Sequence, residues 1–218
     1  MKLNRFFVII LIFFIKNLFS ETTRPISFQA DRVEYIFKKG KEQTICKGKA
    51  KIWRDDFIIN ADLIKIYGSK NEFSEAYKNV KIVSIPDNVI ITGDYAEYNN
   101  TNSYAKVFKN PVLYVTNEKL RIESAVMESY FDENIAVALG EVIITQTNYK
   151  AFCEKGVYYK DKNIIELSGN PVVYYDNDKF KSKKIIIYVK EKRVKLFGDI
   201  EAMVFSKKER KVEKTHSE

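Results

Sequence analysis

The chain has 218 residues, of which 45% are hydrophobic and 30% are charged, and its formal net charge is +8. This length suits one large all-β domain or two small domains. The basic residues alternate with apolar ones and gather into no stripe shared with aromatics, which argues against a nucleic-acid-binding protein.

The first predicted element is an export signal. Lys2 and Arg5 precede an unbroken apolar run over residues 6–15. A core of this length is typical of a signal peptide and short for a membrane span. We therefore expect residues 1–20 to be a signal peptide. It is either cleaved after Ser20 or, because Leu18 is large for a cleavage site, retained as a membrane anchor.

A unit of about 30 residues then repeats six times, and three anchors mark it. The first is a small residue followed by an acid or its replacement: Ala30-Asp31, Ala61-Asp62, Gly93-Asp94, Ser124-Ala125, Cys153-Glu154 and Ser182-Lys183. The second is a tyrosine: Tyr35, Tyr67, Tyr98, Tyr130, Tyr159 and Tyr188. The third is a turn-forming residue: Gly48, Asn79, Asn110, Gly140, Gly169 and Gly198. Successive anchors lie 29 to 32 residues apart, so the sequence predicts an array without a linker.

Each unit is expected to form two strands. Apolar residues alternate with polar ones, and polar turn clusters occur twice per period, once after each tyrosine. This pattern predicts about 12 or more long antiparallel strands joined by hairpins. The glycine or asparagine inside every second strand predicts a bend, which would fold the sheet over itself with its apolar faces inside.

The interior of such a sheet is either a packed sandwich core or an apolar groove. The residues expected to face it are Ile52, Ile59, Ile66, Ile82, Ile91, Phe108, Ile122, Val142, Ile144, Leu167, Ile187 and Leu196.

The sequence shows no catalytic or metal-binding set, and we expect no enzyme, no metal and no cofactor. The one histidine, His216, lies in a charged tail over residues 206–218 that we expect to be disordered. Asp31, Asp62 and Asp94 occupy equivalent positions one repeat apart, which favours turn-stabilising or solvent-facing roles. Cys46 and Cys153 have no metal spacing. Export permits a disulfide between them, but their different phases in the repeat favour free buried thiols.

Residues 30–73 carry the pattern A-D-x-V-x-Y, a polar hairpin, G-x-A-x-I, a short acidic turn, and a second A-D with a tyrosine downstream. This pattern resembles the OstA-like family, the LptA and LptD N-terminal-domain family of lipopolysaccharide-transport proteins. The resemblance covers about residues 26–205, and we assign residues 21–205 to one OstA-like domain.

The resemblance implies an all-β fold, a folded-over antiparallel β-jellyroll with an apolar groove inside. It implies a periplasmic protein that shields acyl chains of lipopolysaccharide or a related lipid between the inner and outer membranes. Its implied protein partners are an inner-membrane transporter component, an outer-membrane translocon and further copies of the chain. They would be reached through the terminal strands at about residues 26–37 and 194–205.

Two alternatives stay open at this point. One is a membrane-anchored component of the same machinery, resembling LptC. The other is a structural or polysaccharide-binding β-repeat protein with parallel strands, against which the two hairpin-like turns per unit argue.

Overall fold

The structure, a computed structural model, describes residues 25–55, 57–68 and 70–205. The expected signal peptide, the charged tail and His216 lie outside these ranges. Within them no helix is long and apolar enough to cross a bilayer. The described residues form β1 (Ser27–Gln29), β2 (Arg32–Ile36), β3 (Gln43–Arg54), β4 (Phe57–Tyr67), β5 (Phe73–Ser84), β6 (Val89–Asn99), β7 (Tyr104–Phe108), β8 (Val112–Val115), β9 (Leu120–Glu123), β10 (Val126–Tyr130), β11 (Ile135–Gln146), β12 (Tyr149–Tyr159), β13 (Ile164–Ser168), β14 (Val172–Tyr175), β15 (Asp178–Lys181), β16 (Lys184–Tyr188), β17 (Arg193–Phe197) and β18 (Glu201–Met203).

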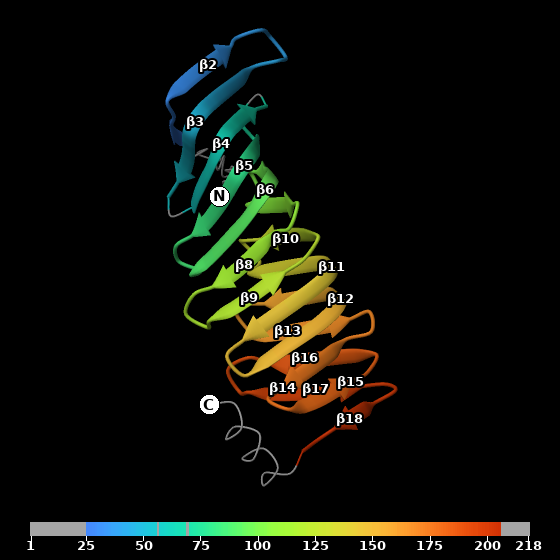
Figure 1. Ribbon diagram of the computed structural model, residues 1–218. Coiled ribbons are helices and arrows are strands. Elements are labelled where there is room, and N and C mark those ends of the chain that lie inside the picture. Colours follow the sequence, from blue (N-terminus) through green and yellow to red (C-terminus); the bar gives the residue numbers. More distant parts are fainter. Residues whose placement is uncertain (1–24, 56, 69, 206–218) are drawn as a thin grey trace, which may run out of the picture.

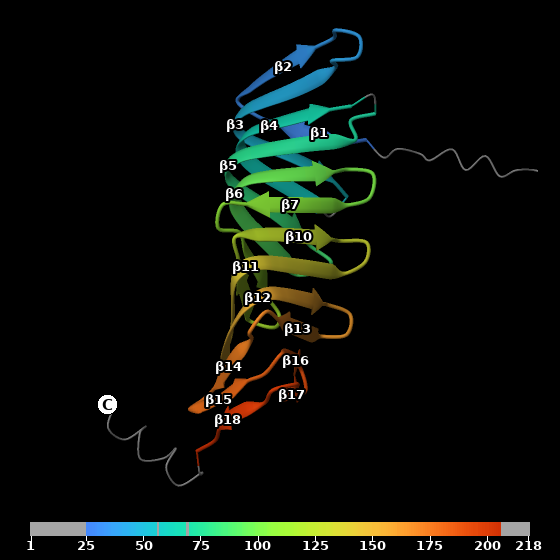
Figure 2. The ribbon, with the colours of Figure 1, turned by 90° about the vertical axis from the view of Figure 1, so that its right-hand side faces the viewer.

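These strands form one sheet, folded over into two layers. We call first layer the one that contains β2, β7, β10, β13, β16 and β17 (Figure 2), and second layer the one that contains β1, β8, β9, β14, β15 and β18. The long strands β3 to β6, β11 and β12 have 11 or 12 residues each and pass from one layer into the other. The strands follow one another along the long axis, from β2 at one end to β18 at the other (Figure 1).

The prediction of about twelve long antiparallel strands is confirmed. Six of them are the continuous long strands, and the other six are pairs of short strands in line, such as β7 with β8 and β13 with β14. Every pairing in the described sheet is antiparallel, which excludes the parallel repeat considered above.

The bend is more general than the sequence predicted, because every strand turns from one layer to the other and not only every second one. The third anchor supplies one half of the bend: Gly48, Asn79, Asn110, Gly140, Gly169 and Gly198 all have positive φ. The small-residue anchor of the neighbouring strand supplies the other half. The amide of Asp31 donates to the carbonyl of Gly48 at 2.9 Å, and that of Glu154 donates to Gly169 at 3.1 Å.

Glycine is required at position 48 for space as well as conformation. Its φ is +77°, and a Cβ there would lie 2.5 Å from a carboxylate oxygen of Asp31. The two sequence anchors therefore form one structural feature, which we call the fold line. The opposite side, where the turns of the two layers face each other, we call the open edge.

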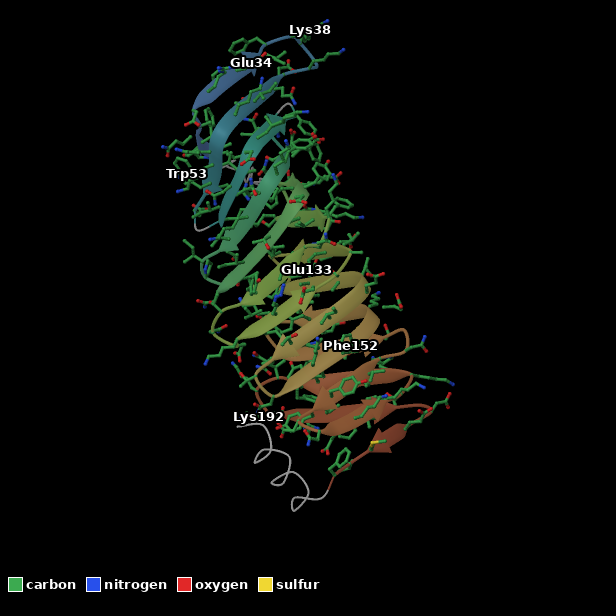
Figure 3. The ribbon with its side chains drawn as sticks, viewed as in Figure 1. Glu34, Lys38, Trp53, Glu133, Phe152 and Lys192 are labelled. Carbon is green, nitrogen blue, oxygen red and sulfur yellow. The ribbon has the colours of Figure 1, made fainter. Side chains whose placement is uncertain are left out.

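The core lies between the layers. Alternate residues of each strand point inward and are buried, including Ile64, Ile82, Ile91, Ile144 and Ile165, each less than 2% exposed. The outward residues include charged, aromatic and half-buried aliphatic side chains. Trp53 and Phe152 lie on this outer face (Figure 3), each beneath a lysine side chain, Lys51 and Lys150 respectively. The interior is therefore largely a packed core, the first of the two possibilities that the sequence left open.

Candidate functional site

The inward residues form two continuous rows that run from one end of the sheet to the other. In each row every residue is the direct cross-strand partner of the next. The second-layer stripe consists of Phe28, Ile52, Ile59, Ile82, Ile91, Leu113, Ile122, Ile144, Ala151, Val173, Phe180 and Ala202. The first-layer stripe consists of Val33, Cys46, Ile64, Ala76, Ala96, Val107, Met127, Ala138, Gly156, Leu167, Ile185 and Leu196.

The stripes contain no charged or amide side chain. At a strand spacing of about 4.8 Å, twelve cross-strand partners extend over roughly 50 Å. The rows stay in register because neighbouring long strands carry their bulges at the same level, for example between Lys47 and Ala50 in β3. One bulge per strand at one level lets a bent sheet keep the same face inside on both sides of the bend.

Most of the predicted interior residues lie where the sequence placed them. The ten buried, inward-facing ones are Ile52, Ile59, Ile66, Ile82, Ile91, Ile122, Val142, Ile144, Leu167 and Ile187. Leu196 also faces inward, as the cross-strand partner of Ile185, and is half-buried because its strand lies at the end of the sheet. Whether these side chains contact a lipid stays a prediction.

Phe108 is the exception, and its assignment to the interior is wrong. In β7 the inward positions are Ala105 and Val107, both 0% exposed, so Phe108 points outward. There it stacks on Tyr95 with ring centroids 5.5 Å apart, beneath the ammonium group of Lys106.

Sequence reasoning missed that the first-layer stripe has small residues on either side of its middle. Ala76, Ala96, Ala138 and Gly156 face an opposite layer rich in isoleucine. Their signal in the sequence was a small residue two or three positions before the third anchor, as for Ala76 and Ala138, or three positions after the first anchor, as for Ala96 and Gly156. Small side chains in one layer let the isoleucines of the other fill the space between the layers.

The open edge is closed by contacts between the layers. The ring of Phe57, at the start of β4, stacks on Tyr98 with centroids 4.6 Å apart and meets the edge of Phe131 at 4.9 Å. Further along, Lys160 of the turn after β12 forms an ion pair with Asp87 of the turn after β5. Asp87 also accepts a hydrogen bond from Ser84 at 2.5 Å. Lys190 and Glu118 form a second ion pair across the edge, at 3.8 Å.

Two cavities interrupt this closure. One, of about 160 Å³, is bounded by Tyr149 and Tyr175 of the second layer and by Ile187, Val189 and Val194 of the first. The other, of about 20 Å³, lies beside the Lys160–Asp87 pair and reaches Tyr158. Both lie between the layers, so the packing of the interior is incomplete at the open edge.

The two ends of the sheet expose apolar side chains. At the N-terminal end Tyr35 is 50% and Phe37 is 86% exposed, and their rings stack at 5.9 Å. At the C-terminal end Ile200, Met203 and Val204 are each more than half exposed. Within the part of the chain that the structure describes, each of β1, β2, β17 and β18 pairs on one side only, which agrees with the edges predicted at residues 26–37 and 194–205.

The titratable residues singled out in the sequence lie apart from one another along the sheet. Asp31, Asp62 and Asp94 lie exposed along the fold line, and Asp62 accepts a hydrogen bond from Asn79 at 3.0 Å. No group of three metal-ligating side chains occurs among the described residues. Cys46 and Cys153 are both buried and free, and burial raises the pKa of each thiol, that of Cys153 to about 12.

Over residues 27–193 the chain matches the model of a family described as LptA/(LptD N-terminal domain) LPS transport protein. No curated protein matches it. Among solved structures 19 chains match. One is the crystal structure of LptH, the LptA homologous periplasmic component of the conserved lipopolysaccharide transport device from Pseudomonas aeruginosa. It is 12% identical with a TM-score of 0.27, and the match covers 86% of this chain and 99% of that one.

Proposed function

We propose, since this chain belongs to the family of LptA and LptD N-terminal lipopolysaccharide-transport proteins, that it shields lipid acyl chains between its two layers while the lipid crosses the periplasm. The cargo is lipopolysaccharide or a related lipid. Membership of this family supports a transport function, and the two apolar stripes provide an apolar path for the acyl chains.

The observation that carries the proposal is the continuity of the stripes. Exposing a methylene group to water costs about 0.8 kcal/mol, so a chain of a dozen carbons costs on the order of 10 kcal/mol. A path for such a chain must therefore be apolar without interruption, and each stripe is apolar from Phe28 or Val33 at one end to Ala202 or Leu196 at the other.

The interior is packed in the free protein, so an acyl chain enters by parting the layers at the open edge. The inward side chains then contact the acyl chain instead of each other. Little apolar surface is exposed to water, either with the lipid bound or without it. The fold line stays intact because backbone hydrogen bonds cross it, such as that from Asp31 to Gly48. Among the described residues the contacts across the open edge come from side chains, which makes it the side that opens at lower cost.

A bridge between membranes also needs contacts at the ends of the sheet. Among the described residues, β17 and β18 on one copy and β1 and β2 on the next each have one edge without a partner strand, and such edges are suited to strand addition. The exposed side chains of Phe37 and Met203 would be covered in such a contact. By the same route the terminal strands would meet an inner-membrane transporter component and an outer-membrane translocon.

Mass spectrometry of lipid that co-purifies with the protein from its native periplasm tests the proposal. We expect an acylated lipid in amounts approaching one per chain. Absence of any acylated lipid, together with no uptake of added lipopolysaccharide by the purified protein, would overturn it. N-terminal sequencing of the same preparation separates a cleaved periplasmic protein from an anchored, LptC-like one, since only the latter keeps Met1.

A further inference from the structure

Two tyrosine hydroxyls at the open edge are buried without a partner. Tyr149 and Tyr158 lie near opposite ends of β12, and the bend of that strand at Cys153 and Glu154 carries them into opposite layers. Tyr149 is 8% and Tyr158 is 2% exposed. Among the described residues these are the buried side-chain oxygens that make no hydrogen bond. A buried polar group without a partner is unfavourable by an amount comparable to a lost hydrogen bond, so such groups are rare unless they have a role.

The surroundings of the two hydroxyls change from apolar to charged over a short distance. Tyr149 borders the 160 Å³ cavity, whose inner wall is apolar and includes Ile187 and Val189. Tyr158 borders the smaller cavity, next to Lys160. Ahead of both, toward solvent, lie the ion pairs that close the open edge. The hydroxyls therefore mark the boundary between the apolar interior and the polar rim.

The charge beside the hydroxyls indicates which ligand group would suit them. Glu118 is only 16% exposed, and its carboxylate raises the pKa of both tyrosines, after the larger effect of burial, that of Tyr158 to about 12. Both side chains therefore stay neutral hydrogen-bond donors. A neutral hydroxyl donates to a neutral carbonyl oxygen, whereas a phosphate would be drawn to the cations Lys192 and Arg193, which line the same cavity.

We propose that Tyr149 and Tyr158 form a polar subsite at the open edge that donates hydrogen bonds to the ester or amide carbonyl joining an acyl chain to the head of a bound lipid. This subsite rests on the proposed function, because it requires the acyl chain to lie between the layers. It places the head of the lipid at the rim, outside the ion pairs of Lys160 and Lys190, and the first methylenes against Ile187 and Val189.

The test uses two lipid probes whose hydrocarbon chains have the same length. One is 1-monomyristoylglycerol, which has an ester carbonyl, and the other is its ether analogue 1-O-tetradecylglycerol, which has none. Equilibrium dialysis below the critical micelle concentration measures their affinities for the mature protein and for Tyr149→Phe, Tyr158→Phe and the double variant. Tyr174→Phe, an outer-face tyrosine that is 39% exposed, is the matched control.

We expect the wild-type protein to prefer the ester by about three- to tenfold, the value of one or two neutral hydrogen bonds. The double variant should lose this preference and bind the ether as well as the wild-type protein does. Its unfolding temperature should stay the same or rise, because unpaired buried hydroxyls have been removed. The control should keep the preference.

Equal affinities for the two probes in the wild-type protein would overturn the subsite while leaving the proposed function standing. A loss of affinity for both probes in the double variant would also overturn it, since that result indicates damaged packing. Binding of neither probe would contradict the proposed function itself.

Discussion

Lys160 and Asp87, 73 residues apart in the sequence, form an ion pair that joins the first layer to the second across the open edge. Both side chains are largely buried, with 24% and 18% of their surfaces exposed. The pair stands in line with the ring cluster of Phe57 and with the Lys190–Glu118 pair. The contacts that hold the open edge together therefore come from side chains, in turns for the ion pairs and largely at strand ends for the ring cluster, while the fold line is held by the backbone.

Lys160→Met removes this ion pair and leaves the carboxylate of Asp87 partly buried beside Ser84 alone. We expect the free energy of unfolding to fall by about 1–3 kcal/mol, because an uncompensated charge remains. Lipid uptake should become faster, since less must be broken to part the layers. Urea denaturation and the rate of uptake of a fluorescent fatty acid measure the two effects.

Lys184→Met is the matched control, because its ion pair with Glu166 at 2.8 Å lies within the first layer and is more exposed. It should cost less than about 1 kcal/mol and leave the uptake rate unchanged. Equal uptake rates in the two variants would show that the Lys160–Asp87 pair does not restrain the open edge.

Phe57→Ala removes the ring that contacts both Tyr98 and Phe131 at the open edge. The loss of two aromatic contacts and of the buried area should lower the free energy of unfolding by about 2–3 kcal/mol. Phe152→Ala, on the outer face, should lower it by about 1 kcal/mol or less. Denaturation midpoints at equal m-values compare the two, and a larger loss for Phe152 would contradict the role given to the ring cluster.

The sequence was sufficient for the architecture because the repeat period, the alternation and the two turns per unit are local patterns. The sequence did not predict that every strand bends. The bend forms where the small residue and aspartate of one strand meet the glycine of the next, and they meet only through strand pairing, as Asp31 does with Gly48. Phe108 was misplaced because a large apolar residue was expected inside, whereas the register of β7 puts the smaller Val107 there. The contacts at the open edge could not be predicted, because no local pattern relates Asp87 to Lys160.

Gly48→Ala should destabilise the fold line. Alanine is strained at a φ of +77°, and its methyl group would lie 2.5 Å from Asp31. We expect a loss of about 2–3 kcal/mol in the free energy of unfolding. Gly40→Ala has a similar φ of +75° but open space around it, so it measures the conformational part alone, about 1 kcal/mol. Equal losses would mean that the close approach of Asp31 does not matter.

The two thiols should be inert in the folded protein. Burial raises the pKa of Cys46 and that of Cys153, so the reactive thiolate is scarcer than for an ordinary cysteine. At pH 8 we expect no reaction with a thiol reagent such as Ellman's on the timescale of minutes, and rapid reaction of both after unfolding in urea. Fast modification of the native protein would contradict the burial of these residues.

The most direct measurement of the central claim is photocrosslinking from single positions to lipopolysaccharide bound by the purified protein. A photoreactive amino acid is placed at Ile82 or Ile144 in the second-layer stripe, and at Ile90 or Phe108 on the outer face as controls. Both stripe positions should crosslink to the lipid and both outer positions should not. Crosslinking that is equal on the two faces, or confined to the outer face, would contradict the assignment of the acyl chains to the space between the layers.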